Sequence, residues 1–359
     1  MNRLLSAIRY QPSAISHPLR VGFVGCGRHA TTNLYPALRH APAELVAVCA
    51  RHRDHAERTA RQFGARHAYE GWRAMLDSGG LDAVLVCGDP ALHAEVAAEA
   101  LRRGLAVWVE KPPAPTAAEA ETLAQVAREA GRPLAVGFQK RFAPAYVAAA
   151  RRARRWGDLA HVGITFAVGP ARPDEFRRDI AIHALDLARL FGGEVARLTF
   201  ERHEDGNGVT WAVALRFASG AVGTLTLSNQ RGWGQPNERV ELTARGRRSP
   251  LGGGWLVVDN LTRLTIYPRD DTHPGFVPGD RALPRVWEPN LTVPTAEMGS
   301  LFLQGYVGEL RAFAEAALDG RAVSPDIADG MAALRLVEAL GGPAGRVVEM
   351  GRRNAHDTP

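Results

Sequence analysis

The chain has 359 residues, 46% hydrophobic and 23% charged, a composition typical of a folded globular protein with room for two domains. Its net charge of +6 is carried almost wholly by arginine, since Lys111 and Lys140 are its two lysines. The basic residues form no stripe with interleaved aromatic side chains, and no apolar run approaches membrane-spanning length. We therefore expect neither nucleic acid nor a membrane as partner.

Three cysteines, Cys26, Cys49 and Cys87, lack the spacing of a zinc site or a disulfide framework. This predicts no metal and a reducing compartment. Residues 1–18 contain only a short apolar patch, without the core of a signal peptide. We therefore expect a cytoplasmic protein with a loose N-terminal tail over these residues.

The segment 19–30, LRVGFVGCGRHA, predicts a nucleotide-binding turn. Its apolar first half suits a strand that is buried on both faces. Gly25 permits a tight turn, Gly27 leaves the backbone open to a pyrophosphate, and Ala30 lets the next helix pack closely. The N–H groups at the start of that helix then face the phosphate. A plain glycine-rich turn is the alternative, but the position between a strand and a helix favours a dinucleotide.

Strands and helices alternate as far as residue 138, which predicts an α/β Rossmann domain with a doubly wound parallel sheet over residues 19–142. A capping box of Thr116 and Glu119 opens the helix that runs to residue 130. Ligands of such sheets lie at the carboxyl ends of the strands. The expected strands are 19–24, 44–50, 81–87, 105–109 and 133–138, and the other expected helices are 28–40, 54–63, 71–76 and 91–103.

The end of the second strand, CARHR at 49–53, indicates which nucleotide is bound. An acid at this place would bind the free 2′-hydroxyl of NAD, whereas arginine favours the 2′-phosphate of NADP. Ala50 stands in the position of the acid, and Arg51 and Arg53 suit a phosphate. We therefore expect NADP in preference to NAD. The alternative is that these arginines merely begin a solvated helix.

The remaining sequence predicts a C-terminal α+β domain over 143–342 with a large open, mostly antiparallel sheet, followed by a tail over 343–359. Along 208–217 apolar residues alternate with Thr210, Ala212 and Ala214, so one face is small and flat. Such a face packs against a symmetric copy, which predicts a homodimer or homotetramer. Residues 268–298 are expected to form a long loop or arm. The expected strands are 160–168, 195–203, 208–217, 220–229, 237–245 and 255–267, and the expected helices are 179–191, 299–319 and 326–341.

Four motifs in register resemble the Gfo/Idh/MocA oxidoreductases, a family named after glucose–fructose oxidoreductase, inositol dehydrogenase and a rhizopine-catabolism protein. They are VGFVGCGRHA at 21–30, DPALH at 89–93, EKP at 110–112 and DIAIH at 179–183. The resemblance extends from about residue 20 to 342. It implies NAD(P)-dependent redox chemistry on a carbohydrate-like alcohol or ketone, such as a sugar, an inositol or a nucleotide-sugar. The family's lysine, aspartate and histidine fall on Lys111, Asp179 and His183.

Together with the glycine turn, the resemblance implies a set of cofactor-binding residues. They are Gly25, Gly27, Arg28, His29, Arg51, Arg53, Asp89, Pro90, His93, Glu110, Lys111 and Gln139.

Two departures from the family pattern concern the surroundings of these residues. Gly88-Asp89 precedes Pro90 where relatives commonly have a neutral Thr-Pro or Asn-Pro. The approach to Asp179, EFRR at 175–178, lacks the usual glycines. Arg172, Arg177 and Arg178 suit a phosphate or carboxylate, although an exposed loop explains them equally well.

The three catalytic candidates have complementary chemistry. His183 ionises near neutral pH and suits exchange of the hydroxyl proton. Asp179 precedes it by one helical turn, where it would orient the imidazole or bind a substrate hydroxyl. Lys111 suits donation to a substrate oxygen. Taken singly, these residues also suit an N-cap, a core histidine and a surface lysine. Their joint occurrence with a nucleotide fold favours the catalytic interpretation.

Three functions are compatible with these motifs. The first is a sugar, inositol or nucleotide-sugar oxidoreductase. The second is a redox-assisted glycoside hydrolase or lyase with a tightly bound nicotinamide, which would show no net cofactor turnover. The third is a non-catalytic NAD(P)-sensing protein, which the set of Lys111, Asp179 and His183 disfavours because a sensor needs no proton shuttle.

Overall fold

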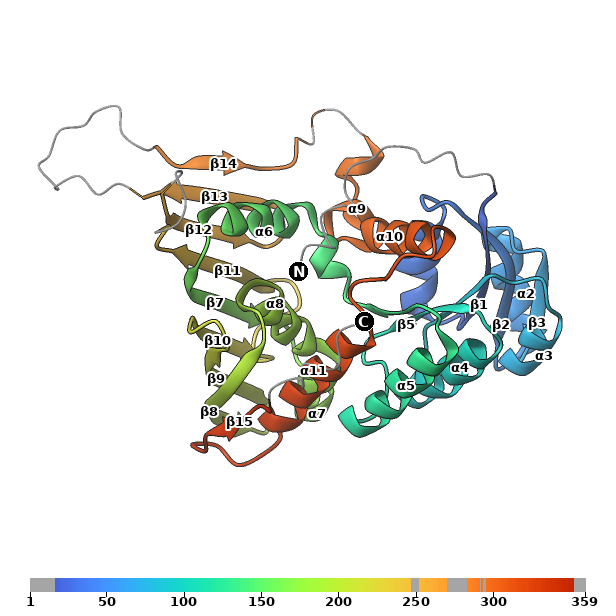
Figure 1. Ribbon diagram of the computed structural model, residues 1–359, viewed down its shortest axis with the longest axis horizontal. Helices are drawn as coiled ribbons and strands as arrows, with labels where there is room; N and C mark the ends of the chain where they lie inside the picture. Colours follow the sequence, from blue (N-terminus) through green and yellow to red (C-terminus); the bar gives the residue numbers. More distant parts are fainter. Residues whose placement is uncertain (1–16, 247–251, 270–282, 291, 293–294, 352–359) are drawn as a thin grey trace, which may run out of the picture. The chain divides into compact units, whose positions relative to one another are not determined.

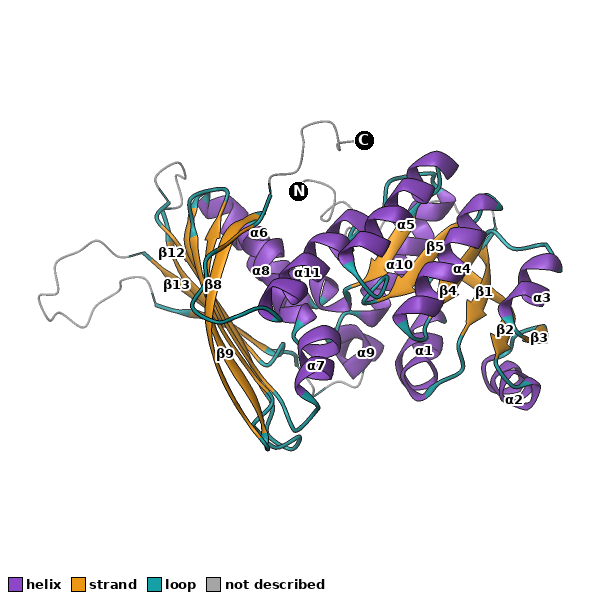
Figure 2. Cartoon of the chain, turned by 90° about the horizontal axis from the view of Figure 1, so that it is seen from below, coloured by secondary structure: helices purple, strands orange, loops and turns teal. Residues whose placement is uncertain are grey.

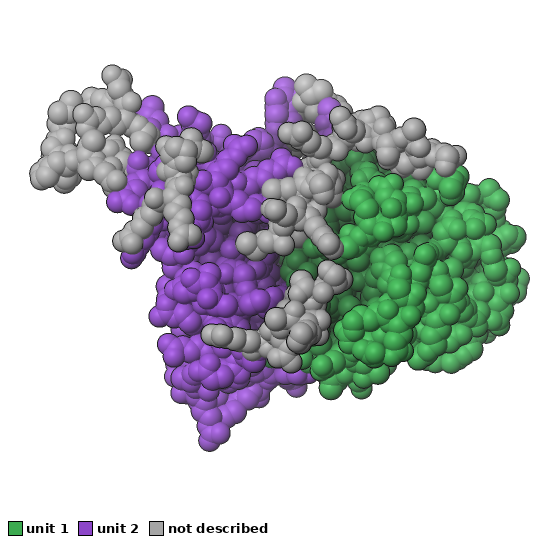
Figure 3. Space-filling model, viewed as in Figure 1, with its two compact units in different colours: residues 1–143, 299–335 green, residues 144–298, 336–359 purple. Residues whose placement is uncertain are grey.

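The computed structural model describes residues 17–246, 252–269, 283–290, 292 and 295–351. The chain divides into two compact units, residues 1–143 with 299–335 and residues 144–298 with 336–359 (Figure 3). The division after residue 143 lies beside the predicted one. The C-terminal domain expected over 143–342 includes residues 299–335, which belong to the first compact unit.

A six-stranded parallel sheet in the order β3-β2-β1-β4-β5-β6 forms the centre of the first unit (Figure 1). This confirms the predicted doubly wound Rossmann architecture. The chain returns from the edge strand β3 to β4 beside β1, so the strand order reverses between β1 and β4. The strands are β1 (Leu19–Val24), β2 (Ala43–Ala50), β3 (His67–Glu70), β4 (Ala83–Val86), β5 (Ala106–Glu110) and β6 (Leu134–Gly137).

The helices of this unit follow the predicted alternation, with two differences. The short strand β3, HAYE, was not predicted, because it is polar and only four residues long. The first helix begins as a π-helical segment, and Pro36, which has no N–H to donate, lies in its first α-helical turn. The elements are η2 (Ala30–Leu34), α1 (Tyr35–Leu38), α2 (Arg53–Phe63), α3 (Trp72–Asp77), α4 (Pro90–Arg102), α5 (Ala117–Ala130) and η3 (Gln139–Phe142). Thr116 caps α5 as predicted, since its side chain accepts a hydrogen bond from the N–H of Glu119.

Helix α10 (Tyr306–Leu318) explains why the first unit includes a segment from late in the sequence. Tyr306, Leu310 and Phe313 belong to the same buried core as Phe23 of β1 and Tyr35 of α1. Burial of such side chains contributes roughly 1.5–3 kcal/mol each, so the helix is bound firmly to this sheet. Helix α9 (Ser300–Leu303) precedes α10, and α11 (Ile327–Leu340) begins in the first unit and ends in the second.

The second unit contains a nine-stranded sheet in the order β14-β13-β12-β11-β7-β10-β9-β8-β15. Neighbouring strands are antiparallel except for the parallel pair β7 and β10, which confirms the predicted mostly antiparallel sheet. Helices α6 (Pro144–Trp156) and α8 (Ile182–Gly192) cover one face, as Figure 2 shows. The strands are β7 (Leu159–Ala167), β8 (Val195–Asp205), β9 (Gly208–Phe217), β10 (Val222–Ser228), β11 (Asn237–Ala244), β12 (Gly254–Asp259), β13 (Arg263–Pro268), β14 (Arg285–Trp287) and β15 (Val348–Glu349).

Three predictions for this sheet need correction. The expected strand 255–267 is two strands, β12 and β13, joined by a turn in which Asn260 and Leu261 have positive φ angles of 47° and 63°. The expected loop 268–298 contains β14, and the expected tail 343–359 contains β15, which pairs with β8. Both strands are short edge strands whose pairing comes from distant neighbours. Residues 1–16 and 352–359 of the two expected tails, and residues 270–282 of the expected arm, lie outside the described residues.

Across the part of the chain that the structure describes, no helix combines the length and apolar character needed to cross a membrane.

Candidate active site

A cavity of about 720 Å³ lies at the carboxyl ends of β1, β2 and β4, where the strand order reverses. This is the position at which open α/β sheets bind their ligands. The loops after the three strands supply most of its lining. Its residues include Gly25, Cys26, Gly27, Arg51, His52, His55, Trp72, Cys87, Gly88, Asp89 and Leu92.

The two glycines of the predicted turn have the geometry that a dinucleotide requires. Gly25 has a φ of +111°, and a Cβ there would lie 2.0 Å from the carbonyl oxygen of Cys87, so only glycine fits. A Cβ on Gly27 would meet nothing within 4 Å. The backbone therefore borders open space beside the cavity, as the approach of a pyrophosphate demands. The residues present fit a nicotinamide dinucleotide.

Tyr35 supports this turn, although nothing in the sequence spacing indicated it. Its hydroxyl donates to the carbonyl oxygen of Gly25 at 2.9 Å and lies 3.8 Å from the Sγ of Cys26. The ring stacks on Phe23, with 4.2 Å between centroids, and is 1% exposed. The glycine turn thus rests on a buried aromatic side chain of the following helix.

Basic side chains gather where the second strand ends. Arg51 is exposed and lines the cavity, whereas the Arg53 guanidinium is bonded to Glu57 at 2.9 Å. Asp54 accepts a hydrogen bond from Arg58 at 2.8 Å, which lowers the pKa of its carboxyl. Asp54 is thus engaged along its own helix.

Three lining residues were missed by sequence reasoning. His52 and His55 lie beside Arg51, and Trp72 begins α3 after the unpredicted strand β3. The two histidines lie three residues apart directly after the strand end. This helical spacing was the sequence signal that could have identified them as lining residues. Trp72 had none, because β3 itself was not predicted.

The buried carboxylate of Glu110 organises the end of β5. Glu110 is 4% exposed and accepts hydrogen bonds from the Nε2 of His29 at 3.2 Å and from the backbone N–H of Lys111 at 3.0 Å. Burial alone would raise the pKa of this carboxyl. The His29 hydrogen bond and the Lys111 charge outweigh burial, so the pKa lies below its ordinary value. The structure thus brings the predicted residues His29, Glu110 and Lys111 together, with Lys111 half-buried.

Glu110 should make the stability of the protein depend on pH. A carboxyl whose pKa is lower in the folded chain stabilises the fold above its unfolded pKa, about 4.3, and loses this contribution as the pH falls through the folded pKa. We expect Glu110→Gln to lower the unfolding free energy at about pH 7 by about 1.5–3 kcal/mol, and by less at about pH 4. Urea unfolding at both pH values measures this. An equal loss at both would show that folding does not lower the pKa of this carboxyl.

The loop after β4 begins α4. Asp89 caps this helix by accepting a hydrogen bond from the N–H of Leu92 at 2.9 Å, and Pro90 follows in the first turn. Asp89 lines the nucleotide cavity. His93 is 1% exposed, with both ring nitrogens at hydrogen-bond distance from backbone groups. That Asp89, Pro90 and His93 bind the cofactor stays a prediction.

Two other predicted cofactor residues lie in different surroundings. Gln139 begins η3 after β6, is 6% exposed, and donates from Nε2 to the hydroxyl of Tyr306 at 3.4 Å. Its Oε1 is buried and accepts no hydrogen bond from the described residues. Arg28 is exposed directly after the glycine turn. Their contact with the cofactor also stays a prediction.

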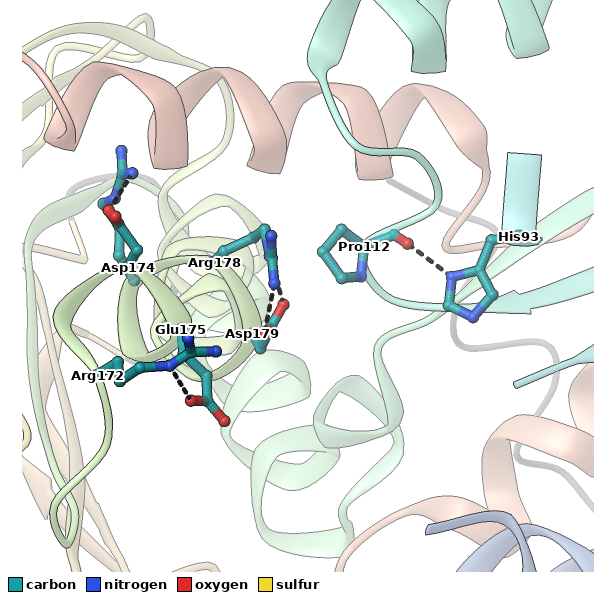
Figure 4. Close-up of polar contacts among 8 residues, drawn as sticks. His93, Pro112, Arg172, Asp174, Glu175, Arg178 and Asp179 are labelled. Atoms are coloured by element: carbon teal, nitrogen blue, oxygen red, sulfur yellow. Dashed lines mark hydrogen bonds and ion pairs between the residues drawn. The ribbon is translucent and has the colours of Figure 1, made fainter. Parts of the chain in front are cut away.

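In the second unit, Asp179 and His183 lie in one continuous helical segment. Asp179 belongs to the π-helical segment η4 (Phe176–Ile180), and Ala181 is the N-cap of α8, so Asp179 is not a helix cap. Its carboxylate accepts two hydrogen bonds from the Arg178 guanidinium, at 2.9 and 3.1 Å (Figure 4). His183, in the first turn of α8, is 9% exposed. Arg178 is a partner of Asp179 that sequence reasoning did not assign.

The arginines near Asp179 line a cavity of about 540 Å³ in the second unit, with Arg202 and Glu204 of β8 and Trp211 of β9. Each arginine of the approach is ion-paired. Arg172 lies 3.4 Å from Glu175, and Arg177 lies 2.7 Å from Asp174 in α7 (Pro173–Glu175). These pairs neutralise much of the positive charge that the sequence suggested for a phosphate or carboxylate.

No group of three or more His, Cys, Asp or Glu side chains suited to a metal ion occurs among the described residues.

Comparison with known proteins places these features among oxidoreductases. A family model described as "Oxidoreductase family, NAD-binding Rossmann fold" (GFO_IDH_MocA) matches residues 19–138. The chain is 33% identical over 294 residues to the D-glucoside 3-dehydrogenase of Escherichia coli (strain K12), an alignment that covers 74% of this chain and 76% of that enzyme.

Two further similarities concern a nucleotide-sugar enzyme and a solved structure. The chain is 33% identical over 206 residues to the dTDP-3,4-didehydro-2,6-dideoxy-alpha-D-glucose 3-reductase of Streptomyces violaceoruber, covering 53% of this chain and 60% of that reductase. It therefore spans less than two thirds of the length of that relative. The crystal structure of a dehydrogenase from Chromobacterium violaceum is similar with a TM-score of 0.79 and 25% identity, over 90% of this chain and 95% of that one.

Proposed function

The chain belongs to the Gfo/Idh/MocA oxidoreductase family with its NAD-binding Rossmann fold, and from this premise we propose that it transfers a hydride between a nicotinamide dinucleotide and a carbohydrate-like alcohol or ketone. The observation that carries the proposal is the cavity of about 720 Å³ at the reversal of strand order, bordered by Gly25 and Gly27. The two relatives named above act, by name, on a D-glucoside and on a dTDP-linked sugar. Both names support a carbohydrate as the substrate class.

The proposed residue roles follow from the chemistry of each side chain. A bound nicotinamide supplies the hydride acceptor or donor. His183 takes up the hydroxyl proton when an alcohol is oxidised and returns it when a ketone is reduced. Lys111 donates a hydrogen bond to the substrate oxygen. Asp179, held by Arg178, orients the imidazole of His183 or accepts from a substrate hydroxyl.

The nucleotide is proposed to be NADP(H). Ala50 ends β2 where an acid would bind the ribose, and the nearest acid, Asp54, is bonded to Arg58. Arg51 lines the cavity, and in this proposal it binds the 2′-phosphate with Arg53 beside it. A reducing, cytoplasmic location fits the three free cysteines. Burial raises the pKa of the Cys49 thiol to about 12, so that thiol stays protonated.

A substrate panel tests the function directly. Polyols, keto-sugars and nucleotide-sugars are incubated with NADP(H) and with NAD(H), and the near-ultraviolet absorbance of the reduced nicotinamide is followed. We expect net oxidation or reduction with at least one carbohydrate. Product formation without net cofactor turnover would instead indicate the redox-assisted hydrolase or lyase. Nucleotide binding without any product would indicate a sensor.

We further propose that the protein is a homo-oligomer formed through the open face of the nine-stranded sheet. Ala212 and Ala214 of β9 are exposed on that face, whereas their neighbours Trp211 and Val213 are buried on the other. We expect a dimer or tetramer by light scattering at micromolar concentration. Ala214→Arg should shift the protein toward the monomer, because a long charged side chain prevents close sheet packing. A wild-type monomer at this concentration would contradict the proposal.

A further inference from the structure

One buried histidine bonds two loops of the first unit that the proposed chemistry uses. His93, in the first turn of α4, lies with Nε2 2.9 Å from the backbone N of Gly88 and Nδ1 2.8 Å from the carbonyl oxygen of Pro112. Figure 4 shows the contact with Pro112. Gly88 lines the nucleotide cavity, and Pro112 directly follows Lys111.

The two backbone partners determine the state of the imidazole. A backbone N–H only donates and a carbonyl oxygen only accepts, so Nε2 must accept from Gly88 and Nδ1–H must donate to Pro112. The ring is therefore neutral with its proton on Nδ1. Burial lowers the pKa of His93. The Pro112 hydrogen bond and the charges of Glu110 and Asp89 oppose this lowering, while Lys111 adds to it.

The segment after Lys111 depends on this contact because of its composition. Pro112 and Pro113 have no backbone N–H, so neither residue can donate a backbone hydrogen bond that would fix the segment. Lys111 is held from the other side by the bond from its N–H to Glu110. At the other nitrogen, the Gly88 loop is packed closely on α4, since a Cβ on Gly88 would lie 2.6 Å from the Cδ2 of Leu92.

We propose that His93 is a positioning residue that links the nucleotide cavity to Lys111, with Nε2 holding the Gly88 loop and Nδ1 holding the backbone that follows Lys111. Both ring nitrogens are used in these bonds, so in this proposal His93 acts through the backbone, and this role replaces the direct cofactor contact expected from the sequence. The part that concerns Lys111 rests on the proposed function. The part that concerns Gly88 rests on nucleotide binding alone.

The two nitrogens can be separated by substitution. In His93→Asn the amide lies near the place of Nδ1 and keeps a donor for Pro112, whereas in His93→Gln it lies near the place of Nε2 and keeps an acceptor for Gly88. We expect H93N to weaken NADP(H) binding by about 10-fold with a smaller effect on kcat, and H93Q to lower kcat by about 10-fold with a smaller effect on binding. Fluorescence titration gives the Kd and steady-state kinetics give kcat.

Lys111 can also be observed without any turnover. Because Lys111 and Lys140 are the two lysines, reductive methylation with a carbon-13 label gives two assignable side-chain signals by NMR. We expect H93Q to shift the Lys111 signal and H93N to leave it near the wild-type position, with Lys140 as internal reference. If no carbohydrate is turned over, the proposed function fails, and the Kd and NMR measurements still test His93.

A matched control distinguishes positioning from general destabilisation. Val96, in the same helix, is 0% exposed, and Val96→Ala should lower Tm without changing the Kd or the Lys111 signal. If both His93 variants change Kd, kcat and the Lys111 signal in equal proportion and in step with Tm, His93 is a structural residue only and the proposal is overturned.

Discussion

His183→Ala is expected to lower turnover by about 10²- to 10⁴-fold, because it removes the group that exchanges the hydroxyl proton. Binding of NADP(H) should barely change, since the nucleotide is proposed to rest on the glycine turn and on Arg51. Steady-state kinetics on the true substrate and fluorescence titration of the cofactor measure the two effects separately. A parallel loss of both would contradict the assigned role.

Lys111 provides a second test of the same step. Lys111→Met should lower turnover by removing the donor to the substrate oxygen, which then stays unpaired. Lys111→Arg keeps the positive charge but introduces a bulky, non-titrating guanidinium, and we expect this variant to lower turnover as well. The other lysine offers a matched control, and Lys140→Met should retain activity.

Asp179→Asn tests whether the carboxylate charge is needed. Because Asp179 lies within η4 and Ala181 is the N-cap of α8, the substitution does not act by changing a cap. Asn preserves the shape but loses the ion pair with Arg178, so we expect an intact fold with damaged catalysis. Near wild-type Tm with low turnover supports this role. Full activity in the His183, Lys111 and Asp179 variants would leave only nucleotide binding.

Arg51→Ala is expected to weaken NADP(H) binding by about 10- to 100-fold and to leave NAD(H) binding nearly unchanged. A hydrogen bond to a charged group contributes about 1.5–3 kcal/mol, and about 1.4 kcal/mol corresponds to a factor of ten. Titration of the wild type and the variant with both nucleotides measures the difference.

Arg53 is the natural control for Arg51. Its guanidinium is bonded to Glu57 in the same helix, so Arg53→Ala should have a smaller effect on NADP(H) affinity. If the wild type binds NAD(H) more tightly than NADP(H), the proposed preference is wrong.

Local patterns in the sequence were sufficient to predict most strands of the Rossmann sheet. Leu19–Val24 is buried and apolar, and Gly25 must be glycine because its φ is positive. The Thr116 cap and the alternation along β9 are likewise properties of neighbouring residues. Short polar strands such as β3 cannot be predicted in this way, because four residues are too few to show an alternation of apolar and polar side chains.

The sequence by itself determined the nucleotide turn, the alternation of strands and helices that indicates a parallel sheet, and the basic end of β2. These features depend on residues a few positions apart, because backbone sterics and side-chain periodicity determine which residue types suit each position.

Only the tertiary structure decided which distant groups meet. It placed α10 in the core of the first unit, Tyr35 under Gly25, His29 on Glu110 and His93 between Gly88 and Pro112. Such contacts depend on side-chain packing and on burial, which make an unpaired polar group costly and so select particular partners. No local spacing encodes them.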